Sequence, residues 1–132
     1  MSETASTKPA SSARVECVIP ILNVRDLAAS LAFYLDVLGF RIDWRGRQMA
    51  SVSRDGKAIM LCQGEQGGPG TWVWIGVEDV EPFYADLRAR GDVKIVLEPT
   101  NYWWAFEFRI ADPDGHVLRL GSDAKDDKPK VD

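Results

Sequence analysis

The hydrophobic and polar positions along the chain predict the same short series of elements twice. In the first half, a strand-like apolar run ends in Val24-x-Asp26, and a helical pattern follows at once. The aspartate is a typical N-cap, and the helix contains Phe33 and Tyr34 and stops at Gly39, a typical C-cap. We therefore expect a strand followed directly by a capped helix.

The second half repeats this order. An alternating run that begins at Trp72 ends in Val77-x-Asp79, and a second helical pattern starts there. This helix also carries a Phe-Tyr pair and ends at a glycine, Gly91. The repetition indicates two modules built on one plan.

Each half continues with two or three strands, and its last two strands are joined by an Asp-Gly turn, Asp55-Gly56 or Asp114-Gly115. Asp-Gly between apolar runs is a strong signal for a β-hairpin. The order βαβββ, twice, predicts an α+β fold with two tandem modules. Because each module has one helix for one face of its sheet, we expect the two modules to form a half-barrel with a concave ligand crevice on the other face.

Polar and breaker-rich segments mark the boundaries of the modules. The segment GEQGGPG is a flexible linker, and both ends of the chain are polar with few aromatic residues, as is typical of disorder. The expected parts are a disordered N-terminal segment at 1–14, a domain at 15–121 with modules at about 15–63 and 71–121 and a linker at 64–70, and a disordered C-terminal tail at 122–132.

Composition excludes several classes of function. The net charge of −4 argues against a nucleic-acid partner, because phosphate contacts need a basic face. No apolar run approaches the roughly 20 residues that cross a membrane, and the N-terminus lacks the apolar region of a signal peptide. Cys17 and Cys62 form no redox or metal motif, so we expect two buried free thiols in a cytoplasmic protein.

Four segments resemble the vicinal oxygen chelate superfamily, which includes glyoxalase I, extradiol dioxygenases, fosfomycin-resistance enzymes and bleomycin-resistance proteins. They are VRDLAASLAFYLDVLGF, DPDGHVLRL, WVWIGVEDVEPFYADL and WWAFEFRIADPDGH. The last two are most similar to the bleomycin-resistance branch. The resemblance covers about Val15 to Gly121. It implies the paired βαβββ fold and a homodimer with two crevices at its interface.

Enzymes of this superfamily hold a divalent metal with His, Gln or Glu side chains from four strands. The corresponding positions here are Ile19, Met60, Trp72 and Arg119, and none of them binds such a metal in the usual way. The single histidine, His116, excludes any site that needs two histidines from one chain. We therefore expect no metal, no cofactor and no catalytic residue.

Aromatic and charged residues take the place of metal ligands at the expected crevice. Strand alternation puts Trp74 on the same face as Trp72, and Arg119 can pair with Glu107 or with an anionic ligand group. The alternatives are that the two tryptophans and Met60 fill the core and that the arginine ion pair is purely structural. The candidate ligand-binding residues are Trp44, Met60, Trp72, Trp74, Tyr102, Trp103, Trp104, Glu107 and Arg119.

These observations favour a binding protein over an enzyme. We expect metal-independent, stoichiometric binding of an aromatic, cationic antibiotic of the bleomycin type, with tryptophans stacking on the ligand and acidic residues near its basic group. This activity would confer drug resistance. The alternatives are a glyoxalase- or dioxygenase-like enzyme of the same superfamily and a natural-product binding module in antibiotic biosynthesis or sensing.

Overall fold

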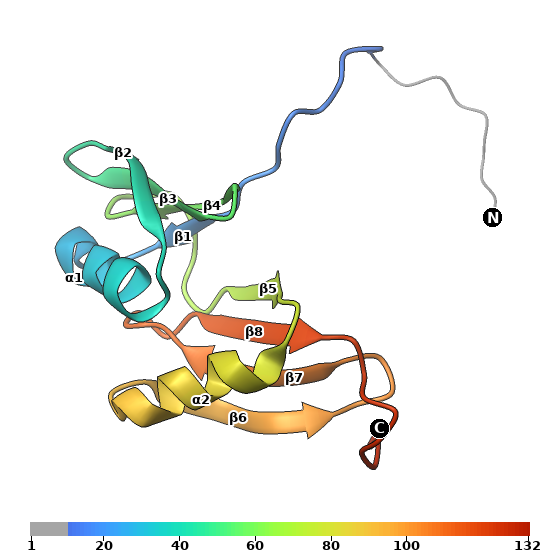
Figure 1. Ribbon diagram of the computed structural model, residues 1–132. Helices are drawn as coiled ribbons and strands as arrows, with labels where there is room; N and C mark the ends of the chain where they lie inside the picture. Colours follow the sequence, from blue (N-terminus) through green and yellow to red (C-terminus); the bar gives the residue numbers. More distant parts are fainter. Residues whose placement is uncertain (1–10) are drawn as a thin grey trace.

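In the part of the chain that the structure describes, eight strands form two separate four-stranded sheets, each with one helical segment packed against it (Figure 1). The computed structural model describes residues 11–132. Residues 1–10, most of the N-terminal segment expected to be disordered, lie outside the described residues. The α+β class and the twice-repeated βαβββ order are confirmed, and the two sheets form no closed barrel.

The first sheet has the strand order β1-β4-β3-β2, in which β1 runs parallel to β4 and the other neighbours are antiparallel. The helix that packs against this sheet, α1, continues into a π-helical turn, η1. The elements are β1 (Ile21–Asn23), α1 (Leu27–Ala32), η1 (Phe33–Val37), β2 (Arg41–Arg45), β3 (Met49–Arg54) and β4 (Lys57–Cys62).

The second sheet repeats this topology with the order β5-β8-β7-β6, and again the first strand is parallel to the last. The elements are β5 (Trp72–Gly76), α2 (Val80–Arg90), β6 (Lys94–Asn101), β7 (Phe106–Ala111) and β8 (Val117–Ser122).

Both helices begin at the predicted caps. The Asp26 carboxylate accepts the backbone N–H of Ala29 at 3.2 Å, and the Asp79 carboxylate accepts that of Glu81 at 3.1 Å. The second helix ends at Gly91 in the left-handed conformation, with φ of 78°. No helix among the described residues is long and apolar enough to cross a bilayer.

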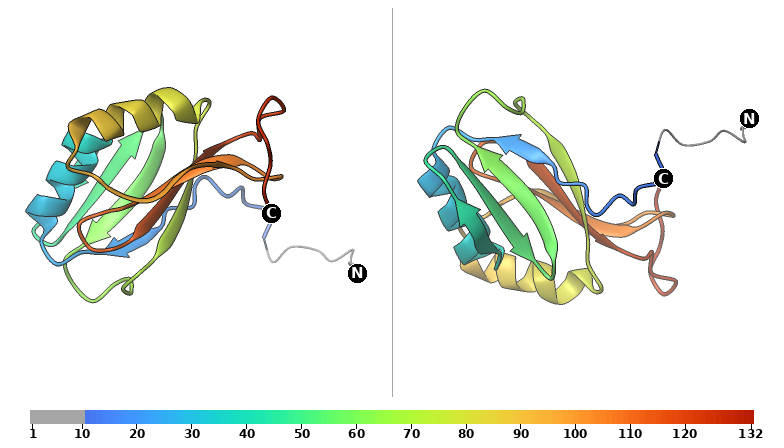
Figure 2. Two further views of the ribbon diagram at one scale, coloured as in Figure 1. Left: turned by 90° about the horizontal axis from the view of Figure 1, so that it is seen from below. Right: turned by 90° about the horizontal axis from the view of Figure 1, so that it is seen from above.

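The helix-facing sides of both sheets share one hydrophobic core. The helices α1 and α2 lie next to each other on the same side of the molecule (Figure 2), where Arg90 donates a hydrogen bond to the carbonyl of Asp36 at 3.4 Å. Because strand residues alternate, the other side of each sheet points away from this core. The fully buried core residues include Leu22, Tyr34, Ala50, Val52, Leu61, Phe108, Ile110, Leu118 and Leu120.

A turn of the second module is tied to the first helical segment. The Asp112 carboxylate accepts the backbone N–H groups of Asp114 and His116 at 2.9 Å each, and the hydroxyl of Tyr34 at 2.8 Å. Burial of the hydroxyl and the neighbouring Asp112 charge raise the pKa of Tyr34 well above its ordinary value. The raised pKa keeps the hydroxyl protonated, and so a hydrogen-bond donor, at neutral pH.

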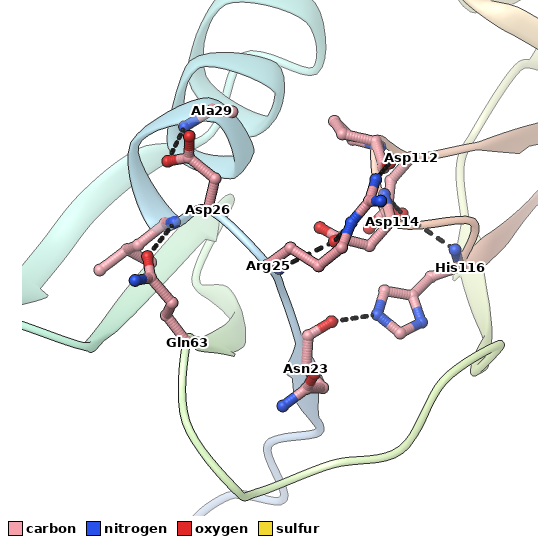
Figure 3. Close-up of polar contacts among 10 residues, drawn as sticks. Asn23, Arg25, Asp26, Ala29, Gln63, Asp112, Asp114 and His116 are labelled. Atoms are coloured by element: carbon pink, nitrogen blue, oxygen red, sulfur yellow. Dashed lines mark hydrogen bonds and ion pairs between the residues drawn. The ribbon is translucent and has the colours of Figure 1, made fainter.

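Two more contacts join the first strand to the same turn (Figure 3). The backbone N–H and the Nε of Arg25 both donate to Asp114 Oδ1, at 2.9 and 3.2 Å. The ring of His116 is fully buried: its Nδ1 accepts the backbone N–H of Thr71 at 3.0 Å, so its Nε2 donates to the carbonyl of Asn23 at 2.6 Å. The only histidine of the chain therefore joins the two modules.

The C-terminal tail follows β8 back to the end of β6. The side-chain amide of Asn101 donates to the carbonyls of Lys125 and Lys128 at 2.8 and 3.1 Å, and its oxygen accepts the N–H of Lys125 at 2.8 Å. The backbone N–H of Val131 donates to the carbonyl of Asn101 at 2.9 Å. That the tail is disordered in solution stays a prediction, and these are the contacts that order it here.

The buried hydroxyl of Tyr34 provides the first test. Tyr34→Phe leaves an oxygen of Asp112 buried without its donor, so we expect the free energy of unfolding to fall by about 1–3 kcal/mol in urea denaturation. Tyr84→Phe is the matched control, because the Tyr84 hydroxyl makes a long hydrogen bond, of 3.5 Å, to Glu98 at the exposed surface. We expect this control to change stability by no more than about 0.5 kcal/mol.

The effect of Tyr34→Phe on the free energy of unfolding should also depend on pH. Because the pKa of Tyr34 is raised by folding, its stabilising contribution is fully present below about pH 10, the ordinary pKa of tyrosine, and is lost as the pH rises further. The stability difference between wild type and Tyr34→Phe should therefore shrink above that pH. A difference that stayed constant into the alkaline range would contradict the buried hydrogen bond.

Candidate ligand-binding face of the second sheet

The outward-pointing side chains of the second sheet form one aromatic and charged surface, here called the outer face of the second sheet. Trp74 lies beside Arg119 in the β5–β8 pair, and Arg109 lies beside Arg119 in the β7–β8 pair. Residues between them, such as Val73 and Phe108, point to the core. The outer face consists of Trp72, Trp74, Tyr102, Trp104, Glu107, Arg109 and Arg119.

A buried carboxylate lies at the base of this face. Glu107 is fully buried, and its Oε1 accepts from Arg119 Nη2 at 2.7 Å. Its Oε2 accepts from Arg119 Nε and from Arg109 Nε, both at 2.9 Å. Burial alone would raise the pKa of Glu107, but the hydrogen bonds and charges of the two arginines outweigh it and hold the pKa below its ordinary value. The cluster therefore carries two positive charges and one negative charge.

Arg109 contacts one group of the aromatic rings on the outer face. The guanidinium of Arg109 lies 5.5 Å from the ring centre of Trp72 and 6.0 Å from that of Tyr102. Tyr102 in turn stacks on Trp104, with ring centres 4.7 Å apart and planes inclined by 10°. Trp72 is 56% exposed and Trp104 is 60% exposed, so the rings present flat surfaces to solvent.

Arg119 contacts the remaining ring of the outer face, that of Trp74. The guanidinium of Arg119 lies 5.2 Å from the ring centre of Trp74, which is 49% exposed. The indole of Trp74 lies across the backbone of Gly121, where a Cβ atom would overlap the ring. The absence of a side chain at Gly121 therefore lets Trp74 lie flat on the sheet.

The structure brings six of the nine candidate residues together: Trp72, Trp74, Tyr102, Trp104, Glu107 and Arg119. The alternative that the two β5 tryptophans fill the core is wrong, because Val73 and Ile75 occupy the core side of that strand. The expected pairing of Arg119 with Glu107 is present. Ligand binding by these residues stays a prediction.

The remaining three candidates lie elsewhere. Trp103 is 63% exposed and contacts the tail, with Lys130 Nζ 5.1 Å from its ring centre. Trp44 and Met60 belong to β2 and β4, in the first sheet. Both residues lie opposite Ser51 of β3, and a register shift precedes Trp44 in β2. Within one chain they belong to a different sheet from the arginine cluster.

The outer side of the first sheet has a polar group that sequence reasoning missed. The hydroxyls of Ser51 and Ser53 donate to the Asp43 carboxylate at 3.1 and 2.6 Å. Arg109 was also missed, although its position two residues after Glu107 on the same strand puts both on one face. Strand alternation was the signal that could have found it.

Two open hollows of the surface lie away from the candidate residues. One, of about 650 Å³, lies between α2, β6 and the tail and is lined by Tyr84, Asn101 and Lys128 among others. The other, of about 400 Å³, lies between the two helical segments and includes Arg54 and Phe83. Neither is lined by a candidate residue.

The positions that hold metal in the superfamily's enzymes do not fit a metal here. Met60 and Trp72 offer no suitable lone pair, Arg119 is a cation bound to Glu107, and Ile19 precedes β1. Among residues 11–132, no three His, Cys, Asp or Glu side chains are grouped so that they could hold an ion.

The contribution of the Glu107 carboxylate to stability should depend on pH. Because its pKa is lowered by folding, its contribution is present above about pH 4.3, the ordinary value for Glu, and is lost as the pH falls below it. We expect Glu107→Gln to lower the free energy of unfolding by about 1.5–3 kcal/mol at pH 7, with the difference shrinking in acid. Glu78→Gln, at an exposed position, is the control and should change little.

The contact between Trp74 and Gly121 can be tested separately. In Gly121→Ala the new methyl group displaces the indole, so we expect an altered near-ultraviolet circular dichroism spectrum and a loss of about 1–3 kcal/mol of stability. Gly68→Ala is the control, because a Cβ there meets no atom within 4 Å. An unchanged spectrum in Gly121→Ala would show that the ring does not lie on the sheet.

Known proteins share this architecture. A bleomycin-binding protein from Streptomyces verticillus, solved with copper(II)-bleomycin, is 22% identical, with a TM-score of 0.65 over 83% of this chain and 98% of that one. A glyoxalase/bleomycin resistance protein/dioxygenase from Nocardioides is 24% identical, with a TM-score of 0.67 over 92% of each chain. A lactoylglutathione lyase from Agrobacterium tumefaciens is 17% identical, with a TM-score of 0.70 over 83% and 95%. At these identities the likeness establishes the fold.

The sequence itself decides the family. No curated protein matches the chain at a significant level. The family model for the Glyoxalase/Bleomycin resistance protein/Dioxygenase superfamily, however, matches residues 14–120, which is most of the chain and both modules. This match agrees with the paired βαβββ topology. The chain therefore belongs to the glyoxalase/bleomycin resistance protein/dioxygenase superfamily.

Proposed function

We propose that this protein is a metal-independent binding protein that holds a flat aromatic small molecule on the outer face of the second sheet. The observation that carries the proposal is a set of exposed rings: Trp72 and Trp74 lie against Arg109 and Arg119, and Trp104 stacks on Tyr102. Rings held in this way offer stacking surfaces without the entropy cost of ordering mobile side chains.

The proton-transfer groups near this face support binding without turnover. Both oxygens of Glu107 accept hydrogen bonds from arginines, and its lowered pKa keeps it ionised. Both ring nitrogens of His116 are used in the junction between the modules. Neither residue is placed as a general acid or base, so the proposed mechanism is stoichiometric sequestration.

A bleomycin-type antibiotic is the specific ligand that we propose to test first. The shared fold with a bleomycin-binding protein supports it, as do the exposed tryptophans. The basic part of such a molecule would need an acidic partner. Glu107 is already paired with arginines, so the acid that we propose for this role is Asp43 on the outer side of the first sheet, next to Trp44 in the sequence.

We also propose that the working form is a homodimer in the cytoplasm. In one chain the candidate residues are divided between two sheets whose outer sides both point away from the shared core. Pairing the first sheet of one protomer with the second sheet of its partner would form two closed crevices and bring Trp44 and Met60 to the aromatic face. Cys62 is buried as expected, whereas Cys17 is exposed, contrary to the expectation that both thiols are buried. Both cysteines are free, which suits a reducing compartment.

A calorimetric titration with bleomycin, with and without bound Cu²⁺, tests the proposed function. We expect saturable binding of one ligand per chain and recovery of unchanged ligand. Trp72→Ala and Trp104→Ala should each weaken binding by about 1–3 kcal/mol, as the loss of a central aromatic contact does. Trp44→Ala should weaken it only if the first sheet of a partner completes the crevice. Unchanged affinity in all three variants would refute the placement, and conversion of the ligand would favour an enzyme.

A further inference from the structure

We infer that the molecule held on the outer face of the second sheet carries an anionic group, such as a carboxylate, attached to its aromatic ring. This inference rests on the proposed aromatic binding site and adds the charge of its ligand. It replaces the cationic, bleomycin-type ligand considered above with an anionic one, so the two make opposite predictions for the same face. Three features of the face lead to it: hydrogen-bond donors without acceptors, local charge and the position of the rings.

The first feature is the unused donors. The Nε of Arg109 and the Nε and Nη2 of Arg119 are bound to Glu107. Within residues 11–132, the Nη atoms of Arg109 and Nη1 of Arg119 donate to no protein acceptor. The two side chains are only 22% and 30% exposed, so these N–H groups lie in a partly covered site. Donors in such a place bind a charged acceptor more strongly than a neutral one.

The second feature is the local charge. One carboxylate lies between two guanidinium groups, so it compensates one of their two positive charges and leaves the cluster with a net charge of +1. This positive region occurs in a chain whose net charge is −4. It attracts anions and repels a cationic ligand group.

The third feature is the geometry. Each guanidinium lies over an exposed ring, Arg109 over Trp72 and Arg119 over Trp74, at 5.5 and 5.2 Å. Because the guanidinium covers one face of each indole, a flat ligand stacks on the other face, and a substituent that extends past the edge of the ring approaches the unused N–H groups. A planar carboxylate matches the fork of N–H groups on a guanidinium edge. Stacking and charge recognition are thus available to one small molecule at once.

Three naphthalene derivatives of similar size test the inference: 2-naphthoate, neutral 2-naphthamide and cationic 2-naphthylmethylammonium. Their affinities for the full chain are measured by calorimetry at pH 7, at low and at high salt. We expect 2-naphthoate to bind about tenfold or more tightly than 2-naphthamide, and the cation to bind most weakly. The preference for the anion should shrink as salt screens the charges.

Two variants show which charge is responsible. Arg109→Gln should bring the affinity for 2-naphthoate down to that for 2-naphthamide, while 2-naphthamide keeps its affinity within about twofold, because the planar amide still covers Trp72. Arg88→Gln removes the same charge from an exposed position on α2 and should leave the preference intact. If Arg109→Gln fails to fold, the salt dependence of the preference in the unaltered protein decides.

The possible outcomes separate the inference from the proposed function. Equal binding of the acid and the amide, both lost in Trp72→Ala, would overturn the inference and leave the aromatic site in place. Tightest binding of the ammonium compound would overturn it in favour of the cationic ligand. If none of the three compounds bound, both the inference and the proposed aromatic site would fall.

Discussion

The outer face of the second sheet depends on one buried carboxylate and the two cations that compensate it. A carboxylate removed from water is tolerated only when opposite charge and hydrogen bonds replace its hydration, and Glu107 obtains both from Arg109 and Arg119. These bonds fix the positions of the guanidinium groups, against which Trp72 and Trp74 pack. The positions of the exposed Trp72 and Trp74 rings therefore depend on the ion pairs that Glu107 makes.

The way the modules join explains why this face is open. The helical segments of both modules share one core, and the junction is fastened by Tyr34 on Asp112 and by His116 on Asn23. This arrangement uses the helix-facing side of each sheet, and no element of residues 11–132 covers the outer side of either sheet. The fold thus provides two candidate half-sites, one with Asp43 and one with the arginine cluster.

The local features of this protein could be predicted from sequence, and the long-range ones could not. Helix caps and Asp-Gly turns act within a few residues, so the two βαβββ modules and the starts of both helices were predicted correctly. Strand alternation placed Trp74 with Trp72 because both lie on β5. The separation of Trp44 and Met60 from the other candidates depends on how two sheets pack, and the binding of the tail by Asn101 depends on a fold already formed. No short sequence pattern encodes either.

The contact between Trp74 and Gly121 also constrains how this face can evolve. The two positions lie on neighbouring parallel strands, and the ring occupies the space that any side chain at position 121 would need. A lineage that acquires a larger residue at 121 must first give up the tryptophan or move it, and a lineage that acquires the tryptophan must already have the glycine. The two residues therefore form one inherited unit. Descent of this aromatic face among relatives is best traced through the pair, since either residue alone can occur for other reasons.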